Sequence, residues 1–331
     1  MTNIYMNFKS LIVVFLYAVS LPAMTKAQSL SNPKASKEAV ALFNYLVDQS
    51  GKKILSGQMS SSWGINEINY IQEVTGKQPA INGFDFINDI DNPSEVKGAL
   101  DWWNSGGIST IMWHMGAPGL GEGYESSKMK IDIERCFEKG TKEYEIFWSE
   151  LKEKADLLEQ LRDANVPILW RPFHELNGHW FWWSKGGPEQ FKKLWIAMYT
   201  YFTETRKLDN LIWVLCYTED SDPKWHPGKQ YVDLAGADIY NVGDSPQTEM
   251  YKNAKKVVNP GVPVVYHECG TPPNPEACIR EGAMWSWWMQ WHTDHLTNTD
   301  KAYLKEVYWH DLIITKDELP DIVKVYGNDK M

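Results

Sequence analysis

Two glutamates stand at the ends of apolar segments in which carboxylates are otherwise rare. Glu175 closes "VPILWRPFHE" (166–175) and Glu268 closes "VPVVYHE" (262–268), and a histidine precedes each of them. If both segments are parallel strands of one barrel, their carboxyl ends face each other across its mouth. Two facing carboxyls suit glycoside hydrolysis, because one protonates the leaving oxygen and the other attacks carbon or activates water. The alternative is that each glutamate forms a rim ion pair with Arg171 or a neighbouring histidine.

Tryptophan is concentrated around the first of these glutamates. The segment "WRPFHELNGHWFWWSKGG" (170–187) holds four of the 17 tryptophans of the chain. Large flat rings beside ionisable groups are typical of a cleft that binds sugars, although many tryptophans must also fill the core. We expect Trp182 and Trp183 to pack within the loop. For His179, solvation and contact with a sugar remain equal alternatives.

The elements that must position these residues follow a repeating pattern. Short apolar segments alternate with amphipathic helical patterns, which is typical of parallel βα units. Eight strands are predicted, at 53–58, 79–86, 108–115, 166–173, 211–217, 232–240, 262–268 and 284–292. Helices are predicted at 36–50, 64–75, 94–105, 141–164, 188–206 and 247–257, with little helix after the fifth and seventh strands. We therefore predict an α/β fold, a closed (β/α)₈ TIM barrel with a single catalytic domain.

Polar residues gather where the predicted strands end. The third strand ends at "WHM" with His114, the sixth at "DIY" with Tyr240, and the eighth at "QWH" with Trp291. In barrels of this type the chemistry lies at the carboxyl ends of the strands. A long segment after the third strand (116–140) could form a wall of the cleft or an extended substrate platform.

Composition excludes several other classes of protein. The chain has 331 residues with a formal net charge of −10, which argues against nucleic-acid binding. It contains no CxxC or HExxH motif, so we expect no metal site, and we expect no cofactor. Of the four cysteines, Cys216 is expected to be a buried free thiol. Cys269 and Cys278 could form a disulfide in an oxidising compartment.

The N-terminal segment is typical of an export signal. Lys9 precedes "LIVVFLYAVSLPA", and a small-residue cleavage site follows at Ala27. We therefore predict a signal peptide at 1–27, a polar linker at 28–36 and the barrel domain at 37–331. The mature protein is expected to be exported to the periplasm or the outside, without a membrane segment and as a monomer.

At "WRPFHELNGHWFWW" the chain also resembles glycoside hydrolase family 26. The resemblance continues through "WHMGAP" (113–118), "YVDLAGADIYN" (231–241) and "VVYHECG" (264–270), in order along most of the chain. Members of this family are retaining (β/α)₈ glycosidases, most of them endo-acting β-1,4-mannanases. The resemblance implies hydrolysis of β-1,4-mannosidic bonds in mannan, glucomannan or galactomannan.

The resemblance also implies a role for each matching residue. Glu175 would be the acid/base and Glu268 the nucleophile, while Tyr240 would contact and orient the nucleophile. Arg171 would hold a carboxylate by a charged bond, with bidentate geometry as one option. Sugar contacts in the subsite of cleavage are implied for the remaining matching positions, which are His114, His174 and Trp180.

Two positions depart from the family pattern. The residue after the nucleophile is commonly phenylalanine and is Cys269 here, which affects local packing. A tryptophan on the last strand usually forms the floor of the cleavage subsite, and "MWSWWMQWH" offers four; we choose Trp291. Strand alternation gives Trp285 and Trp287 the same orientation as Trp291 and Trp288 the opposite one.

Several alternatives stay open. The same family includes enzymes acting on mixed-linkage β-1,3-1,4-glucan or β-1,3-xylan. A non-catalytic glycan-binding protein, or a hydrolase using Cys269 or Ser286 as nucleophile, would belong to other classes. For the double displacement, the pKa of Glu175 should be raised by apolar neighbours such as Trp180 and by the charge of Glu268.

Overall fold

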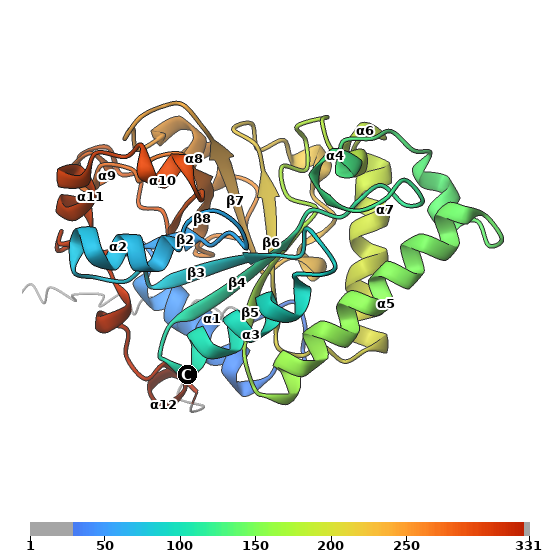
Figure 1. The fold of residues 1–331 in the computed structure, drawn as a ribbon, viewed down its shortest axis with the longest axis horizontal. Helices are drawn as coiled ribbons and strands as arrows, with labels where there is room; N and C mark the ends of the chain where they lie inside the picture. The colour runs from blue at the N-terminus through green and yellow to red at the C-terminus, as the bar shows by residue number, and fades with distance from the viewer. Residues whose placement is uncertain (1–28, 328–331) are drawn as a thin grey trace, which may run out of the picture.

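The computed structural model describes residues 29–327, and its centre is a closed barrel of eight parallel strands (Figure 1). The barrel closes where the last strand pairs with the first through Gln58 and Gln290. Each predicted strand segment overlaps one barrel strand, so the predicted fold class is confirmed. The strands are β2 (Gly57–Met59), β3 (Ile81–Asp85), β4 (Ile108–Trp113), β5 (Ile168–Pro172), β6 (Leu211–Tyr217), β7 (Leu234–Ile239), β8 (Val264–Cys269) and β9 (Trp288–Gln290). The predicted signal peptide (1–27) lies outside the described residues.

Helices follow the strands on the outside of the barrel. The predicted ones correspond to α1 (Lys37–Gln49), α2 (Glu67–Thr75), α3 (Asn92–Asn104), α5 (Lys142–Asp163), α7 (Pro188–Tyr199) and α8 (Thr248–Ala254). The segment predicted as helix to residue 206 leaves the α-helical pattern at Thr200 and continues as a π-helical turn to Thr205. After β6 only the short 3₁₀ turns η3 (Pro223–Trp225) and η4 (Lys229–Tyr231) occur, and α9 (Pro275–Glu281) follows β8.

Side-chain caps fix where the longer helices begin. The Thr141 hydroxyl accepts the backbone N–H of Tyr144 at the start of α5, and Ser36 does the same for Ala39 at the start of α1. Such caps satisfy N–H groups that have no partner within the helix. Helix α2 ends at Gly76, whose φ of 78° is the left-handed conformation that glycine adopts without strain. Local sequence therefore sets the helix ends that carry the chain to each strand.

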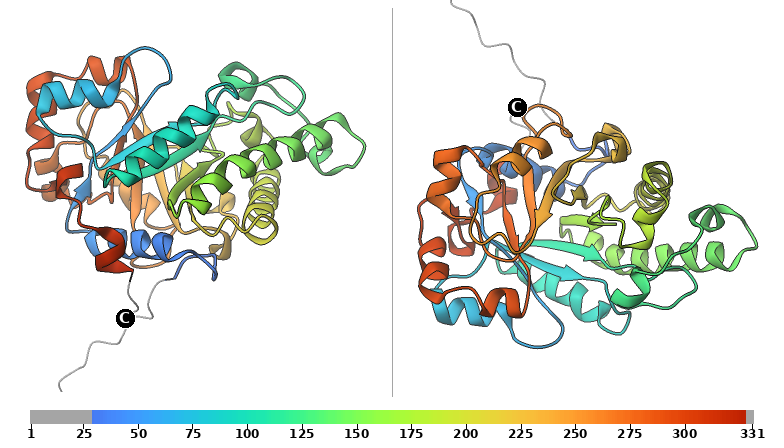
Figure 2. Two further views of the ribbon diagram at one scale, coloured as in Figure 1. Left: turned by 60° about the horizontal axis from the view of Figure 1, so that its bottom comes forward. Right: turned by 90° about the horizontal axis from the view of Figure 1, so that it is seen from above.

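The core has two layers. Inside the barrel, Met59, Met112 and Trp287 pack with other strand side chains and with α1, which closes the end opposite the carboxyl ends of the strands. Outside it, aromatic and aliphatic side chains fill the space between the strands and α3, α5 and α7. In Figure 2, α1 lies at the same end of the molecule as α12 (Ile322–Tyr326), against which it packs. The tryptophan-rich composition therefore serves the core as well as the loops.

Elements that the sequence did not predict are short. Strand β1 (Ile54–Leu55) pairs with β10 (Ile313–Ile314) beside the barrel. Helices α4 (Gly123–Ser127) and α6 (Trp182–Lys185) lie in loops after β4 and β5, and α10 (Asp294–Thr297) and α11 (Lys301–Tyr308) follow β9. The turns η1 (Ile133–Phe137) and η5 (Lys316–Glu318) complete the set in the described chain. Elements of two to eight residues show too few periods to be recognised from sequence.

Residues 29–36, expected as a polar linker, lie against the barrel. The Ser31 N–H donates to the carboxylate of Asp233, and Leu30 and Asn32 are buried. Between residues 29 and 327, no helix combines the length and the hydropathy needed to cross a membrane. Cys136, Cys216, Cys269 and Cys278 are all buried and free, so the disulfide considered for Cys269 and Cys278 is not formed.

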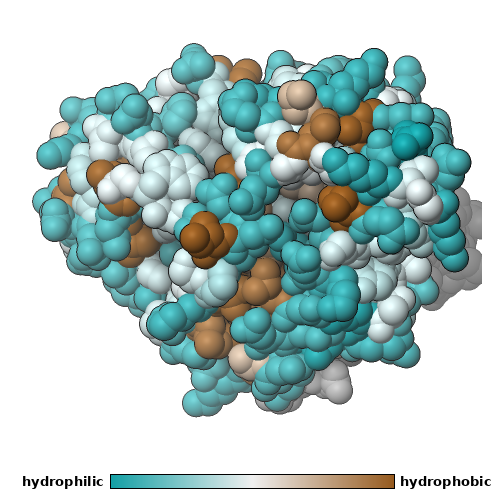
Figure 3. Space-filling model, turned by 45° about the vertical axis from the view of Figure 1, so that its right-hand side comes forward, coloured by the Kyte–Doolittle hydropathy of each residue, from teal (hydrophilic) through white to brown (hydrophobic). Residues whose placement is uncertain are grey.

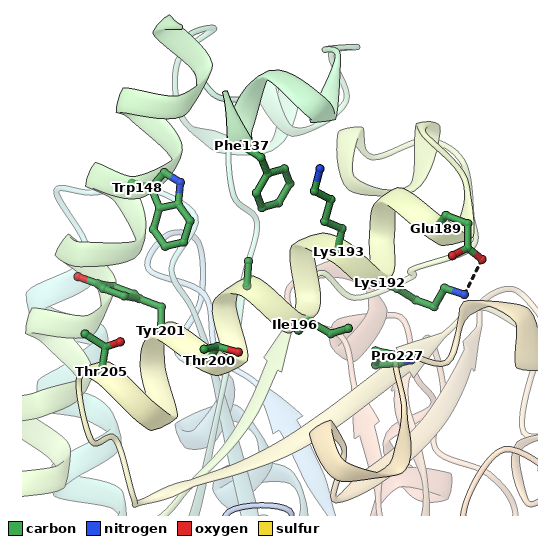
Figure 4. Close-up of a pocket in the computed structure, with 11 residues that line it drawn as sticks. Phe137, Trp148, Glu189, Lys192, Lys193, Ile196, Thr200, Tyr201, Thr205 and Pro227 are labelled. Atoms are coloured by element: carbon green, nitrogen blue, oxygen red, sulfur yellow. Dashed lines mark hydrogen bonds and ion pairs between the residues drawn. The ribbon is translucent and has the colours of Figure 1, made fainter. Parts of the chain in front are cut away.

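The outer surface is mostly hydrophilic on the face shown in Figure 3, with apolar side chains in separate patches. A hollow of about 710 Å³ opens between α5 and α7, where Trp148, Phe137 and Tyr201 surround it (Figure 4). It lies on the outside of the barrel, and its lining includes neither Glu175 nor Glu268. This hollow is therefore separate from the carboxyl ends of the strands, where the sequence predicts the active site.

Candidate active site

The backbone at the end of β5 is bent sharply so that Glu175 points to the barrel axis. Pro172 ends the strand, and Phe173 and Glu175 both adopt left-handed conformations, with φ of 49° and 50°. Non-glycine residues in this region carry about 1–3 kcal/mol of strain each, which surrounding contacts must offset. The Phe173 ring is buried among Trp182, Trp183 and Phe191, and this packing holds the bend.

Register irregularities place the opposing carboxyls. The pairing of β7 with β8 shifts between Ala237 and Asp238, and the pairing of β8 with β9 shifts between Tyr266 and Cys269. Such irregularities re-aim side chains at the end of a strand. As a result, Glu175, Asp238 and Glu268 present carboxylate oxygens that all lie within 4.8 Å of one another. The expected convergence of Glu175 and Glu268 at the barrel mouth is confirmed.

Arg171 lies fully buried in the barrel, below the carboxyls. Its Nε donates to the Thr110 hydroxyl at 3.0 Å and its Nη1 donates to the His267 carbonyl at 2.8 Å. Nη1 is 3.7 Å from Oε1 of Glu268, an ion-pair distance without a direct hydrogen bond. The bidentate option is therefore wrong: the guanidinium donates to Thr110, to a backbone carbonyl and, from Nη2, to the Met59 sulfur, and Arg171 acts on Glu268 through its charge.

Glu268 is buried in surroundings that keep it ionised. The Tyr240 hydroxyl donates to Oε2 at 2.7 Å, and the His267 imidazole lies 3.8 Å from Oε1. Burial alone would raise the pKa of Glu268, but the neighbouring His267 and the charge of Arg171 outweigh it and hold that pKa well below the usual range. A carboxylate that stays charged near the rim can act as a nucleophile.

Glu175 has the opposite character. Burial and the nearby charge of Glu268 raise the pKa of Glu175 above its ordinary value. The Trp180 indole N–H donates to Oε2 of Glu175 at 2.7 Å, which favours the ionised form and lowers the pKa. The expected direction is thus confirmed, while the contribution assigned to Trp180 was wrong in sign. Two facing carboxyls with pKa values shifted apart are suited to one acid and one nucleophile.

Asp238 is a third buried carboxyl that the sequence did not identify as a site residue. Burial and the charge of Glu175 raise the pKa of Asp238 well above its usual range. Its Oδ1 is 3.7 Å from Nε2 of His267. A protonated Asp238 can donate to Glu175, and such a bond stabilises the ionised form of Glu175. The signal that could have revealed it is a carboxylate near the carboxyl end of the largely apolar "VDLAGADIY", whose other carboxylate, Asp233, stands near its start.

His114 and His174 form a buried pair beside the carboxyls. Nε2 of His174 is 3.0 Å from Nε2 of His114, and Nδ1 of His114 is 2.5 Å from the Asp85 carboxylate. Burial would lower the pKa of His114, but Asp85 outweighs it and raises that pKa. Burial, followed by the charge of His114, lowers the pKa of His174 well below the usual range. These opposed shifts favour donation from His114 to His174 in this pair.

Trp291 is the tryptophan of the last strand that reaches the site. Its half-buried ring lies with its centroid 6.1 Å from that of His114. Trp287 points into the barrel interior and Trp288 into the outer layer, as alternation predicts. Trp285 also lies in the outer layer, so its expected orientation was wrong. The reason is that Trp287, next to β9, still forms a bridge with Leu55, whereas Trp285 lies in irregular backbone three residues before Trp288, where alternation does not hold.

The loop after β5 contains both buried and exposed aromatic residues. Trp182 and Trp183 are fully buried, which confirms the expectation that they pack within the loop. Trp180 is 40% exposed, and its indole N–H donates to Glu175. His179 is exposed, and its ring centroid lies 5.5 Å from that of Trp225.

The three carboxyls of Glu175, Asp238 and Glu268 have the spacing of a cation site. Their oxygens already receive the Trp180 N–H and the Tyr240 O–H, and Arg171 supplies a positive charge nearby. The protein therefore compensates these charges with its own donors. The opposed pKa shifts fit an acid and a nucleophile better than a set of three ionised ligands.

The fold is a (β/α)₈ barrel with paired carboxyls at the ends of its strands, an arrangement that is typical of glycoside hydrolases. Residues 31–318 match the model of glycosyl hydrolase family 26, and the chain belongs to this family. The chain is 31% identical to a mannan endo-1,4-beta-mannosidase of Thermothelomyces thermophilus over 88% of its own length and 63% of the relative. It is 30% identical to one of Bacillus subtilis, over 70% of this chain and 72% of that protein.

Solved structures of mannanases are also similar to this chain. A β-mannanase from a symbiotic protist of the termite Reticulitermes speratus, solved in complex with a gluco-manno-oligosaccharide, is similar with a TM-score of 0.80 and 31% identity. That likeness covers 89% of this chain and 98% of the solved one. A Podospora anserina GH26-CBM35 β-(1,4)-mannanase also gives a TM-score of 0.80 and 31% identity, covering 90% of this chain and 70% of that one.

Several relatives are longer proteins. The chain spans 63% of the Thermothelomyces enzyme and 54% of mannan endo-1,4-beta-mannosidase B of Piromyces sp. The shared part is therefore the barrel that carries the candidate site.

Proposed function

We propose that this protein is a retaining endo-β-1,4-mannanase. The observation that supports this most directly is that Glu175 and Glu268 bring carboxylate oxygens within 4.8 Å of each other at the mouth of the barrel. Double displacement requires carboxyl groups about 5–5.5 Å apart, whereas inversion needs about 6.5–9.5 Å to admit a water molecule between them. The relatives named mannan endo-1,4-beta-mannosidase support mannan, glucomannan or galactomannan as the substrate.

In the first step Glu268 attacks the anomeric carbon, and the glycosidic bond to the leaving oxygen breaks. Its ionised state is maintained by the Tyr240 O–H and the buried charge of Arg171. Glu175 donates its proton to the departing oxygen, and its raised pKa lets it keep that proton to higher pH than an ordinary glutamate. The product of this step is a glycosyl ester on Glu268.

In the second step Glu175 is ionised and takes a proton from water. The hydroxide equivalent attacks the anomeric carbon and releases Glu268, so two inversions give net retention. The Trp180 N–H supports the ionised form of Glu175 at this stage. Trp180 thus favours the base half of the cycle, while burial and Glu268 favour the acid half.

Sugar recognition would come from the rings that surround the carboxyls. Trp291 provides the floor below the cleaved sugar, and the exposed ring of Trp180 lies on the side of the acid/base, where the leaving sugar departs. The His114–His174 pair, fixed by Asp85, lies beside the same subsite.

We further propose the domain organisation predicted from sequence, with a signal peptide at 1–27, a linker at 28–36 and the catalytic domain at 37–331. Export to the periplasm or the outside, and a monomeric state, are part of this proposal. The barrel carries its carboxyls on one chain, so no second copy is needed to complete the site. Mass spectrometry of the exported protein would show whether it begins at Gln28.

The test of substrate class compares reducing-sugar release from glucomannan, lichenan and β-1,3-xylan by the purified protein. Release from glucomannan, and from a mannan of mannose alone, with little from lichenan or β-1,3-xylan is expected. Preferential release from lichenan or xylan would replace mannan by a β-1,3-1,4-glucan or a β-1,3-xylan. Binding to mannan without any release would favour a glycan-binding protein instead.

A further inference from the structure

A row of aromatic rings leads away from the candidate cleavage subsite. The ring centroids of Trp291 and His292 are 4.6 Å apart with planes inclined by 32°, and those of His292 and Trp63 are 5.3 Å apart at 81°. Trp63 is 47% exposed, whereas its neighbours in the row are partly buried. Burial lowers the pKa of His292 to about 4, so its ring is neutral in this row at neutral pH.

The row is held by a buried carboxylate that the proposed mechanism does not use. Glu67, at the start of α2, is only 1% exposed. Its carboxylate accepts the Ser61 hydroxyl at 2.8 Å, the Ser61 N–H at 3.2 Å and the Thr293 N–H at 3.2 Å. Glu67 therefore ties the loop that carries Trp63 to the turn that carries Trp291 and His292.

The two segments also fit closely where they meet. Thr293 adopts a left-handed conformation with φ of 50°. A Cβ added at Gly64 would lie 3.3 Å from the Thr293 methyl group, so the loops are already in contact there. An exposed tryptophan on a loop fixed in this way presents its face at little further cost in conformational entropy.

The position of the row identifies the part of the substrate that it faces. Strand β9, which precedes Trp291, is diametrically opposite β5, which precedes Glu175 and Trp180, in the barrel order. Glu175 protonates the leaving side in the proposed reaction, so the row of rings extends on the other side of the cleaved bond. That side holds the glycone, the part of the chain that remains attached to Glu268.

We propose that Trp63, with His292, forms a glycone subsite for a sugar beyond the one that is cleaved, and that Glu67 is the positioning residue of this subsite. The ligand is a β-linked hexosyl unit, whose flat apolar face stacks on the exposed indole. This inference rests on the proposed function, since it takes the direction of the bound chain from Glu175 and Glu268.

The test compares Trp63→Ala with the unchanged protein on three activated aryl β-mannosides, which carry one, two and three sugars. In the unchanged protein kcat/KM should rise with each glycone sugar that is bound, because remote binding supports the reacting centre. On the substrate with one added sugar, kcat/KM of Trp63→Ala should be about tenfold below that of the unchanged protein. This loss corresponds to one stacking contact. Its activity on the monoglycoside should be unchanged.

Trp309→Ala is the matched control, because Trp309 is 59% exposed and lies beside the C-terminal end of α2 instead of the cleft. The control should keep the full rise with glycone length. The inference is overturned if Trp63→Ala keeps it as well, or if Trp63→Ala loses the same factor on all three substrates. If the unchanged protein cleaves only aryl β-glucosides, the mannan proposal fails and the same comparison is made on that series.

Glu67→Ala and Glu67→Gln separate positioning from general stability. Glu67→Ala should reproduce the length-dependent loss of Trp63→Ala, and Glu67→Gln should recover part of it because the amide oxygen still accepts one N–H. Equal loss on the monoglycoside, or no recovery with glutamine, would contradict a positioning role for Glu67.

Discussion

Trp180 offers a perturbation whose effect on pH dependence can be worked out from the structure. Trp180→Phe keeps an aromatic ring beside Glu175 but removes the N–H whose nitrogen lies 2.7 Å from Oε2 of Glu175. That bond stabilises the ionised carboxylate, so its loss should raise the pKa of Glu175 further. Glu175 must be protonated in the first step, and kcat/KM therefore falls as pH rises through this pKa. Trp180→Phe should shift that alkaline limb to higher pH.

The magnitude follows from the strength of the bond. A hydrogen bond to a charged group contributes about 1.5–3 kcal/mol. Trp180 is 40% exposed, so water can partly replace the indole donor and the lower end of the range applies. Since about 1.4 kcal/mol corresponds to one pH unit, we expect the limb to move up by about one unit.

The assay is kcat/KM for a manno-oligosaccharide measured across the pH range for Trp180→Phe and the unchanged protein. The control is Trp309→Phe, which alters an exposed indole beside α2, away from the carboxyls. An alkaline limb that stays in place, or that moves to lower pH, would refute the argument that Trp180 stabilises the ionised acid/base.

Three further predictions concern thiols, the histidine pair and the core. Iodoacetamide should leave activity unchanged because Cys269 is buried and burial raises the pKa of its thiol well above the usual range; inactivation in step with alkylation would instead support a cysteine nucleophile. Asp85→Asn should lower the pKa of His114, and NMR titration of the imidazole measures this pKa. An unchanged value would contradict the conclusion that Asp85 raises it. Trp287→Ala should lower the free energy of unfolding by about 3–5 kcal/mol in urea denaturation, because the fully buried ring fills the barrel interior; a loss below about 1 kcal/mol would contradict that packing.

The barrel was predictable because its signals repeat. Each strand is a short apolar segment, and the long helices, such as α5, show several periods of an amphipathic pattern. Strand alternation oriented Trp287 and Trp288 correctly and failed for Trp285, which precedes β9. Alternation therefore holds for residues that pair with a neighbouring strand, and it fails in the irregular backbone three residues before β9.

The fine geometry of the site was not predictable from sequence. The left-handed conformation of Glu175 and the register shift before Asp238 bring their carboxyls together, and neither leaves a periodic signal. Asp85 and Asp238 were missed because each is one carboxylate at the end of a largely apolar strand, and its partner comes from another strand. Arg171 was correctly expected near a carboxylate, but its hydrogen bonds to Thr110 and a carbonyl depend on the three-dimensional packing.

The central claim is that Glu268 forms a covalent bond to the sugar, while Glu175 donates a proton to the leaving group and then takes one from water. The most direct measurement mixes Glu175→Ala with an aryl β-mannobioside whose leaving group needs no proton, and follows the release of the aryl group and the mass of the protein. We predict a burst of release and a glycosyl adduct on the peptide that contains Glu268. Loss of the burst, or an adduct on any other residue, would contradict the account.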